Sequence, residues 1–286
     1  MPIYPLSEFR KKRRFVGLKR AVLSPVAKIL RPLTPSPRPF EVTQHPMQLA
    51  KLRSPVKLVQ LSDLHLGAQL EPVSVRNWVD ACLAESPDLI VITGDVLDYT
   101  ARGLEAESLR GLSRLEAPLG VWAVWGNQDY IRAMSELKAL RERLESYGIR
   151  VLVNESVNLR EDITLSGLDD ILEGEPELGF LSAASTDRTH ILLGHSPDVL
   201  PLLPKSIDLA LFGHTHGGQI RLPFLGVVET SSRYGHTFLE GWVSQRAYVS
   251  HGLGTTGLPL RIGVSGELAV FNLSKEHPSS VSEEGC

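Results

Sequence analysis

The sequence predicts an α/β fold for the central part of the chain, residues 56–273. There, short apolar runs alternate with segments whose apolar residues recur at helical spacing, and this alternation is typical of β–α units. After Phe212 the helical segments stop, and short apolar runs separated by glycine turns indicate further strands. We therefore expect an alternating first part followed by a strand-rich ending.

Each expected strand is a short run rich in valine, isoleucine and leucine, as in sheets that are covered on both faces. The expected strands are residues 57–61, 89–93, 121–125, 149–153, 163–166, 190–193 and 209–212, followed by 219–222, 238–243, 248–250 and 268–272. The expected helices are residues 73–85, 105–115, 133–147 and 197–203, where apolar residues recur every three or four positions.

The N-terminal part of the chain differs from this domain in charge. Residues 1–40 hold ten lysines and arginines against one acid, Glu8, although the whole chain has a net charge of −3. Apolar residues between Val16 and Leu30 form a rough helical stripe among these cations. This pattern predicts a basic amphipathic arm over residues 1–35.

The segments that flank the domain have their own composition. Prolines concentrate in residues 32–55, which predicts a proline-rich linker or lead-in, so that residues 1–55 together precede the domain. Residues 274–286 are polar and are expected to form a disordered tail.

Length and composition limit the class of protein. The chain has 286 residues, of which 42% are hydrophobic and 22% charged, as is usual for soluble globular proteins. Two cysteines, Cys82 and Cys286, do not make a disulfide framework, so a reducing compartment is expected. No apolar run has the length needed to cross a bilayer.

A pair of arginines near the N-terminus, Arg13 and Arg14, is similar to the start of a twin-arginine export signal. Lys19 and Arg20 interrupt the apolar stretch that such a signal requires. A location at the cytoplasmic face of the membrane is therefore the preferred expectation, and export by a twin-arginine signal is the alternative.

Polar residues suited to metal binding follow the ends of five expected strands. They are Asp63 and His65, Asp95 and Asp98, Asn127, His195, and His214 with His216. Open α/β sheets bind ligands beyond the carboxyl ends of their strands, so we expect these side chains to meet at one site. Carboxylate, imidazole and amide oxygen suit manganese, iron, zinc or magnesium. Two such ions about 3.5–4 Å apart activate water and neutralise phosphate in hydrolases.

Each motif alone also has an ordinary structural explanation. Gly94-Asp95 is a common turn dipeptide, Asn127 could cap the next helix, and a histidine such as His195 often only ends a strand. Residues 213–218, Gly-His-Thr-His-Gly-Gly, are harder to explain in this way, because two imidazoles in a glycine-rich turn have little use in packing. Five motifs in order, each at a strand end, indicate a shared site.

This set of motifs resembles the calcineurin-like metallophosphoesterase superfamily over roughly residues 56–273. The resemblance implies a four-layer αββα sandwich and two divalent metal ions, with manganese expected and iron, zinc or magnesium as alternatives. The two implied ligand sets are Asp63, His65, Asp95 and His216 for one ion, and Asp95, Asn127, His195 and His214 for the other.

The same resemblance implies roles for individual residues at the centre. Asp95 would bridge the two ions, and Asp98 would orient a ligand. Asp95, Asn127 and His195 would be the catalytic residues, with a bridging hydroxide as the nucleophile that attacks phosphorus.

Three shorter motifs resemble a bacterial membrane-associated branch of this superfamily. They are residues 167–170 (Gly-Leu-Asp-Asp), residues 195–198 (His-Ser-Pro-Asp), and residues 252–254 (Gly-Leu-Gly) leading to residues 259–261 (Pro-Leu-Arg). This branch includes cell-envelope phosphoesterases and a UDP-2,3-diacylglucosamine pyrophosphatase of lipid A synthesis. Arg261, which ends the last motif, is expected to contact the substrate.

One position departs from the pattern of the superfamily. Where the family has a phosphate-contacting histidine that can protonate a leaving oxygen, this chain has Gln128. Glutamine can donate a hydrogen bond to substrate but cannot give up a proton. A phosphate leaves readily as an anion, whereas an alkoxide needs an acid, so Gln128 favours a phosphoanhydride substrate. A proton supplied by Asp129 or by water is the alternative.

We therefore expect a hydrolase that cleaves the diphosphate of UDP-2,3-diacylglucosamine to UMP and 2,3-diacylglucosamine 1-phosphate. The basic arm is expected to hold it at an anionic membrane surface. No nucleic-acid partner is expected, because only Phe9 and Phe15 interleave with the cations of the arm. The alternatives are a broader phosphodiesterase or phosphomonoesterase of the cell envelope, and a non-catalytic membrane-binding member of the fold.

Overall fold

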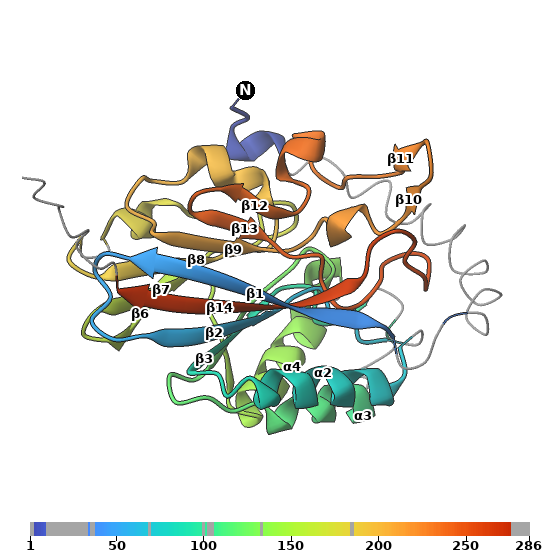
Figure 1. The fold of residues 1–286 in the computed structure, drawn as a ribbon, viewed down its shortest axis with the longest axis horizontal. Coiled ribbons are helices and arrows are strands. Elements are labelled where there is room, and N and C mark those ends of the chain that lie inside the picture. The colour runs from blue at the N-terminus through green and yellow to red at the C-terminus, as the bar shows by residue number, and fades with distance from the viewer. Residues whose placement is uncertain are drawn as a thin grey trace, which may run out of the picture.

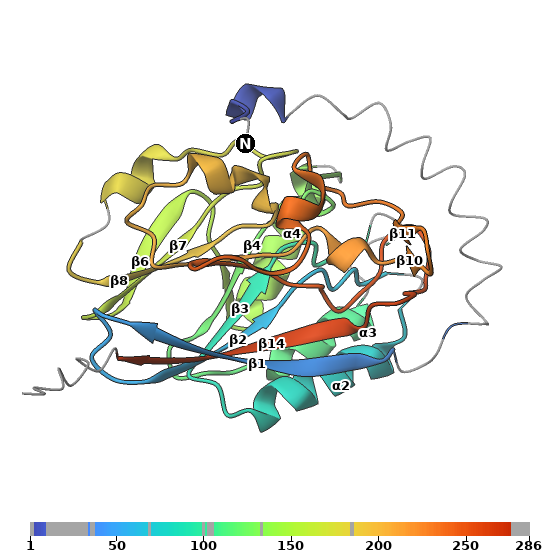
Figure 2. The same ribbon diagram turned by 45° about the horizontal axis from the view of Figure 1, so that its top comes forward.

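The computed structural model describes residues 3–9, 34, 38–67, 70–98, 101, 106–131, 134–183 and 186–275. Within these residues, two six-stranded sheets stack on each other, and a short two-stranded hairpin, β10–β11, projects from one end (Figure 1 and Figure 2). Helices cover the outer face of one sheet. The predicted α/β fold class is confirmed.

The first sheet has the strand order β1–β14–β2–β3–β4–β5. Its strands are β1 (Phe40–Leu49), β14 (Gly266–Lys275), β2 (Val56–Leu61), β3 (Leu89–Thr93), β4 (Val121–Val124) and β5 (Ile149–Val151). Strands β2 to β5 are parallel, whereas β14 runs antiparallel to β2 and parallel to β1. Strand β3 is buried along its whole length, because both faces of the sheet are covered.

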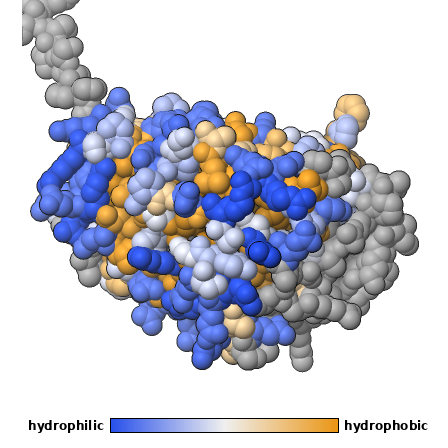
Figure 3. Space-filling view, turned by 90° about the horizontal axis from the view of Figure 1, so that it is seen from below, coloured by the Kyte–Doolittle hydropathy of each residue, from blue (hydrophilic) through white to orange (hydrophobic). Residues whose placement is uncertain are grey.

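Three helices cover the outer face of this sheet: α2 (Pro72–Ala84), α3 (Ala106–Gly111) and α4 (Met134–Ser146). Helix α2 buries Val75, Trp78, Val79 and Cys82, whose spacing of three or four residues places them on one face. Hydrophilic residues cover much of the opposite, solvent-facing side of this layer, with hydrophobic ones between them (Figure 3).

The second sheet has the strand order β12–β13–β9–β8–β7–β6. Its strands are β12 (Gly241–Ser244), β13 (Ala247–Val249), β9 (Leu209–Phe212), β8 (Thr189–Leu193), β7 (Ile163–Gly167) and β6 (Glu155–Arg160). Its four inner strands are parallel, and the two edge strands run antiparallel to their neighbours. Leu58, Val91, Leu193 and Phe271 belong to the core shared by the two sheets.

The outer face of the second sheet is covered by short 3-10 helices instead of long α-helices. They include Gly179–Ala183 and Pro197–Leu202. The chain near its N-terminus joins this layer, because Phe9 is buried there and Tyr4 packs against Tyr234. The outermost layer therefore differs from the α-layer that a four-layer sandwich implies, although the two mixed sheets fit the metallophosphoesterase fold.

Local expectations differ from the structure at several positions, and two of these differences have a clear physical reason. Residues 197–203 were expected to be an α-helix but form a 3-10 helix, in which Pro201 has no N–H for a helical hydrogen bond. Residues 40–49 were expected within a proline-rich lead-in but form β1 and pair with β14 over ten residues. Pro46 is tolerated there because β1 is an edge strand and part of its backbone needs no partner.

The flanking segments are described only in part. Strand β14 continues to Lys275, and the rest of the expected tail lies outside the described residues. Most of the expected basic arm, residues 10–33, also lies outside them. In the part of the chain that the structure does describe, no helix has both the length and the apolar character needed to span a bilayer.

Candidate metal centre

The carboxyl ends of β2, β3 and β4 in one sheet and of β8 and β9 in the other point toward the same end of the sandwich. The loops that follow them bring together all seven side chains that the sequence indicated as ligands. They form two neighbouring groups, Asp63 with His65 and His216, and Asp95 with His195 and His214. Asn127 lies against the second group. Within each group of three, the ligand atoms lie within 4.8 Å of one another.

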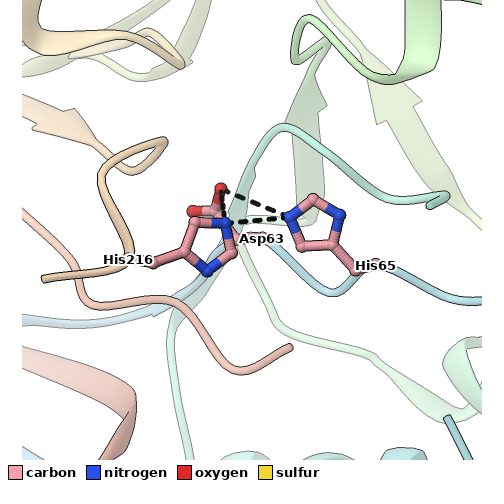
Figure 4. A group of neighbouring side chains, drawn as sticks. All are labelled: Asp63, His65 and His216. Carbon is pink, nitrogen blue, oxygen red and sulfur yellow. Dashed lines mark hydrogen bonds and ion pairs between the residues drawn. The ribbon is translucent and has the colours of Figure 1, made fainter. Parts of the chain in front are cut away.

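The first group is buried between the ends of β2 and β9. His65 Nε2 and His216 Nε2 lie 3.0 Å apart and face the carboxylate of Asp63 (Figure 4). Asp63 Oδ1 is 3.4 Å from His216 Nε2 and 3.9 Å from His65 Nε2. Three atoms that can each offer a lone pair therefore converge on one point.

The second group gathers around His195. Its Nε2 atom lies 3.1 Å from Asn127 Oδ1, 3.2 Å from His214 Nδ1 and 3.3 Å from Asp95 Oδ2. The imidazoles, the amide oxygen and the carboxylate come from four different loops. This convergence corresponds to the second ligand set that the sequence indicated.

Asp95 lies between the two groups. Its Oδ2 atom is 3.3 Å from His195 Nε2 and 3.6 Å from His65 Nε2, so it faces a member of each group. Its Oδ1 atom accepts a hydrogen bond of 2.8 Å from the backbone N–H of Gln128. That bond fixes the rotation of the carboxylate, and the position fits a bridging ligand.

The backbone at the centre adopts an unusual conformation. Five of the gathered residues have a positive φ between 46° and 72°: Asp63, His65, Asp95, His214 and His216. Such a conformation costs a non-glycine residue on the order of 1–3 kcal/mol and persists only where the surroundings enforce it. The loops turn sharply directly after each strand, so that consecutive ligands point inward.

Two glycines allow the loops to approach each other. A Cβ atom on Gly126 would overlap with the carboxylate of Asp95, and one on Gly213 would overlap with Ser62 and Asp63. The absence of a side chain at these positions lets the loop after β4 pass beside Asp95 and the loop after β9 pass beside Asp63.

Hydrogen bonds orient two of the histidines. His195 Nδ1 lies 2.8 Å from the backbone oxygen of Thr93, and His214 Nε2 lies 3.1 Å from the backbone oxygen of Ser231. A carbonyl only accepts, so these nitrogens carry the proton in the neutral rings. The lone pairs of His195 Nε2 and His214 Nδ1 then face the group, as metal ligation requires.

The electrostatics of the group depend on burial and on a close charge pair. Burial alone would lower the pKa of His195, but the carboxylates of Asp95 and Asp63 raise it well above its usual value. Burial would raise the pKa of Asp95, but His195 and His65 lower it to about 2. Burial and the charge of His195 lower the pKa of His214 to about 3. The second group thus holds ionised Asp95 beside protonated His195 and neutral His214, and a metal ion bound there would take the place of the proton on His195.

The donor set fits divalent cations. Carboxylates, imidazoles and an amide oxygen without any thiolate suit borderline and hard metal ions. A buried carboxylate pair such as Asp63 and Asp95 is costly without a counter-charge, and burial raises the pKa of Asp63 accordingly. The two groups therefore support binding of divalent metal ions, while manganese as the native metal stays a prediction.

Two further residues that the sequence indicated, Asp98 and Gln128, lie beside these groups. Asp98 Oδ2 is 3.8 Å from His65 Nδ1, a distance longer than that of a hydrogen bond. Gln128 is largely buried, and its Nε2 donates a 2.7 Å hydrogen bond to Thr256 Oγ1. Gln128 thus stands at the edge of the second group.

Arg261 lies beside the first group and is held by several backbone contacts. Its guanidinium donates hydrogen bonds to backbone oxygens of His216, His251, Gly252 and Gly254. Its Nη2 atom also lies 3.3 Å from His216 Nδ1. This geometry makes Arg261 a positioning residue that holds the loop of His216, whereas its contact with substrate stays a prediction.

Two buried acids near the centre were not identified as structural from the sequence. Asp129 accepts hydrogen bonds from the backbone N–H groups of Gly126, Leu97 and Val96, and so joins the loops after β3 and β4. Its carboxylate faces the backbone, which argues against the alternative that it protonates a leaving group. The second acid is Asp170, whose pKa is raised to about 7 by burial. In the sequence it belongs to the motif of residues 167–170, which indicated only a branch of the family.

The chain is similar to known phosphoesterases over most of its length. The family model of the calcineurin-like phosphoesterases matches residues 56–218. YkuE, an uncharacterized metallophosphoesterase of Bacillus subtilis, is 34% identical over 250 residues, which cover 83% of this chain and 86% of that protein. Cj0846, an uncharacterized metallophosphoesterase of Campylobacter jejuni, is 30% identical over 240 residues, which cover 82% of this chain and 63% of that protein.

Proposed function

Because the chain belongs to the calcineurin-like phosphoesterase family and is a metal-dependent phosphoesterase, we propose that it hydrolyses a phosphoanhydride, namely the diphosphate of UDP-2,3-diacylglucosamine. The products would be UMP and 2,3-diacylglucosamine 1-phosphate. We choose a phosphoanhydride over a phosphoester bond because of the side chain of Gln128, which lies beside the second group of ligands and has no proton to release.

The proposed mechanism uses the described side chains to hold and orient the reacting groups. Asp63, His65 and His216 would hold one ion, and Asn127, His195 and His214 the other, with Asp95 common to both. When bound, two such ions supply an activated water and neutralise the charge that develops on phosphate. The hydrogen bonds that His195 and His214 donate to the backbone oxygens of Thr93 and Ser231 keep the ligand atoms in place through turnover.

This chain departs from the pattern of its family in the residue that would protonate the leaving group. Gln128 already donates Nε2–H to Thr256, and its backbone N–H is committed to Asp95. Asp129 has a pKa raised to about 6 by burial, but its carboxylate accepts hydrogen bonds from backbone N–H groups of its own loop and of the loop after β3. Since neither side chain is directed at the leaving group as a proton donor, a leaving phosphate is favoured over a leaving alkoxide, because it departs as an anion without protonation.

The substrate lipid and the location are further parts of the proposal. The basic arm of the sequence supports a peripheral position at the anionic cytoplasmic face of a membrane. A broader phosphodiesterase or phosphomonoesterase of the cell envelope is the other candidate within the same chemistry. The two candidates differ in the pKa of the group that leaves.

The test is a leaving-group series on the full chain loaded with Mn²⁺. It compares wild type, Gln128→His and the exposed control Gln48→His on UDP-2,3-diacylglucosamine and on phosphodiesters whose leaving groups rise in pKa. We expect the wild-type rate to fall steeply along the series. We expect Gln128→His to fall less steeply, since general acid catalysis contributes about 10²–10⁴-fold.

The outcome that contradicts the proposal is an equal slope for wild type and Gln128→His. Failure of every protein to cleave the diphosphate, with phosphodiesters cleaved well, would favour the broader esterase. Metal content measured on the same samples separates a lost proton donor from a disturbed Asn127 or Asp95.

A further inference from the structure

The β10–β11 hairpin (Arg221–Leu222 and Gly226–Val227) ends in an exposed apolar tip. Phe224 is fully exposed, and Leu225 and Val228 are 79% and 64% exposed. Phe224 also has a φ of 66°, which is rare for an aromatic residue and turns its side chain away from the body. Large apolar side chains in such a position leave water only when another surface covers them.

The hairpin is rigidly attached to the metal centre. It follows directly on His216, and Arg221 Nε donates a 2.8 Å hydrogen bond to the backbone oxygen of Gly217. Arg221 also forms an ion pair with Glu240, and its backbone N–H bonds to Ile262. The tip therefore has a defined position relative to the ligands of the first group.

A large cavity lies beside the root of the hairpin and is connected to the first group through Arg261, whose Nη2 atom lies 3.3 Å from His216 Nδ1. Its volume is about 1030 Å³. Its lining combines apolar and charged side chains: Leu253, Leu260, Ile262 and Val264 with Arg38, Glu41, Arg221, Glu240 and Arg261. A partly apolar space of this size, at the upper end of the range for ligand pockets, thus lies next to the metal centre.

We propose that the β10–β11 tip inserts into a lipid surface and so brings the metal centre to the level of the headgroups. This inference rests on one part of the proposed function, namely that the substrate is a lipid that carries the phosphate to be cleaved. It adds a second, apolar membrane contact to the basic arm, and this contact is built into the catalytic domain itself.

The shape of the tip favours lipid over a protein partner. A stable protein interface buries roughly 800 Å² on each side and requires a complementary surface. Phe224 and Leu225 at a short turn, with Val228 beyond β11 at the hairpin root, offer a point and not a surface, which suits fluid acyl chains. Ile262, 40% exposed and joined to Ile220 at the hairpin root, extends the apolar region toward the cavity.

The experiment measures vesicle binding by the full-length chain at low and high salt. The vesicles consist of phosphatidylcholine with phosphatidylglycerol, and the variants are Phe224→Ser with Leu225→Ser, and the matched control Met134→Ser at an exposed apolar position on α4. Binding through the arm is electrostatic and is screened by salt, whereas apolar insertion persists. At high salt we expect the double variant to bind at least about tenfold more weakly than wild type, from the burial of two large apolar side chains.

A second readout does not depend on affinity. In Phe224→Trp, the tryptophan emission in excess of wild type should shift to the blue with vesicles and be quenched by brominated lipid, whereas Met134→Trp should show neither change. All variants should hydrolyse a soluble phosphodiester at the wild-type rate, because none of these residues lies in the centre.

Unchanged vesicle binding by the double variant, together with a tryptophan at position 224 that stays in water, would overturn the inference. A tip that contacts another protein predicts this same result, and so also counts against it. Insertion of the tip without any cleavage of lipid diphosphates would instead refute the proposed substrate and leave the docking surface standing.

Discussion

Replacement of Asp129 by alanine should destabilise the protein and loosen the metal centre together. The carboxylate accepts hydrogen bonds of 3.0, 3.1 and 3.3 Å from Gly126, Leu97 and Val96, and the side chain is completely buried. Asp129→Ala leaves three buried N–H groups without a partner. At about 1–2 kcal/mol for each bond left unmade, we expect a loss of about 3–6 kcal/mol in the free energy of unfolding.

Urea denaturation of the metal-free protein measures this loss. The matched control is Asp80→Ala, which removes an exposed carboxylate paired with Arg114 and should cost less than about 1 kcal/mol. The loops after β3 and β4 carry Asp95 and Asn127, so Asp129→Ala should also bind metal more weakly than Asp80→Ala. Equal denaturation midpoints and equal metal affinities for the two variants would refute this reasoning.

The contribution of Asp129 to stability should also depend on pH, in a direction that the pKa of its carboxyl group predicts. Burial and the neighbouring charge of Asp95 raise the pKa of Asp129 to about 6. The folded protein therefore holds this proton more tightly than the unfolded chain, and stability from this group falls as pH rises between about 4 and about 6. Alanine has no such group. The stability difference between wild type and Asp129→Ala should thus be larger at pH 4.5 than at pH 7.

Three more outcomes are expected. Asp95→Ala should lower the metal content of both groups, whereas His65→Ala should spare most of the ion in the second group. If elemental analysis of Asp95→Ala still finds two ions per chain, Asp95 does not bridge them. Hydrogen bonds from His251 and Arg221 lower the pKa of Glu240 to about 2, so Glu240→Gln should cost about 1 kcal/mol at pH 7 after allowance for its partial exposure. That cost is present above about pH 4.5 and should vanish as pH falls toward 2 in denaturation curves. Burial raises the pKa of Cys82 to about 12, so in Cys286→Ser iodoacetamide should label it slowly until urea is added, and rapid labelling of folded protein would contradict this.

The ends of the buried strands could be predicted from the sequence because they depend on neighbouring residues along the chain. Buried strands such as β3 appear as uninterrupted apolar runs, and a ligand placed directly after such a run must lie at the sheet edge. Strand β1 was not recognised, since its exposed edge position leaves a sequence with polar residues and Pro46 that is similar to a linker. Its pairing with β14 joins residues more than 200 positions apart, which no local pattern records.

The roles of side chains around the ligands depended on tertiary contacts. The sequence indicated Arg261 as a substrate contact, which stays a prediction, and gave no sign of the four backbone oxygens from two loops that its guanidinium binds. Asp129 was considered only as a proton donor, although its partners are backbone amides of its own and a neighbouring loop. Backbone donors leave no trace in a sequence, because every residue except proline carries one.

The geometry at position 128 explains how the chain can lose the histidine of its family without losing the centre. The bond that orients Asp95 comes from the backbone N–H of Gln128 and does not depend on the side chain there. Gly126, two residues earlier, must remain without a side chain, because a Cβ atom would overlap with Asp95. The backbone of this loop and Gly126 thus hold the carboxylate shared by both groups, while under the proposed function the side chain at 128 determines which leaving group is favoured. Substitutions at Gly126 should accordingly abolish metal binding, whereas substitutions at Gln128 should change which phosphoesters are cleaved and keep both ions.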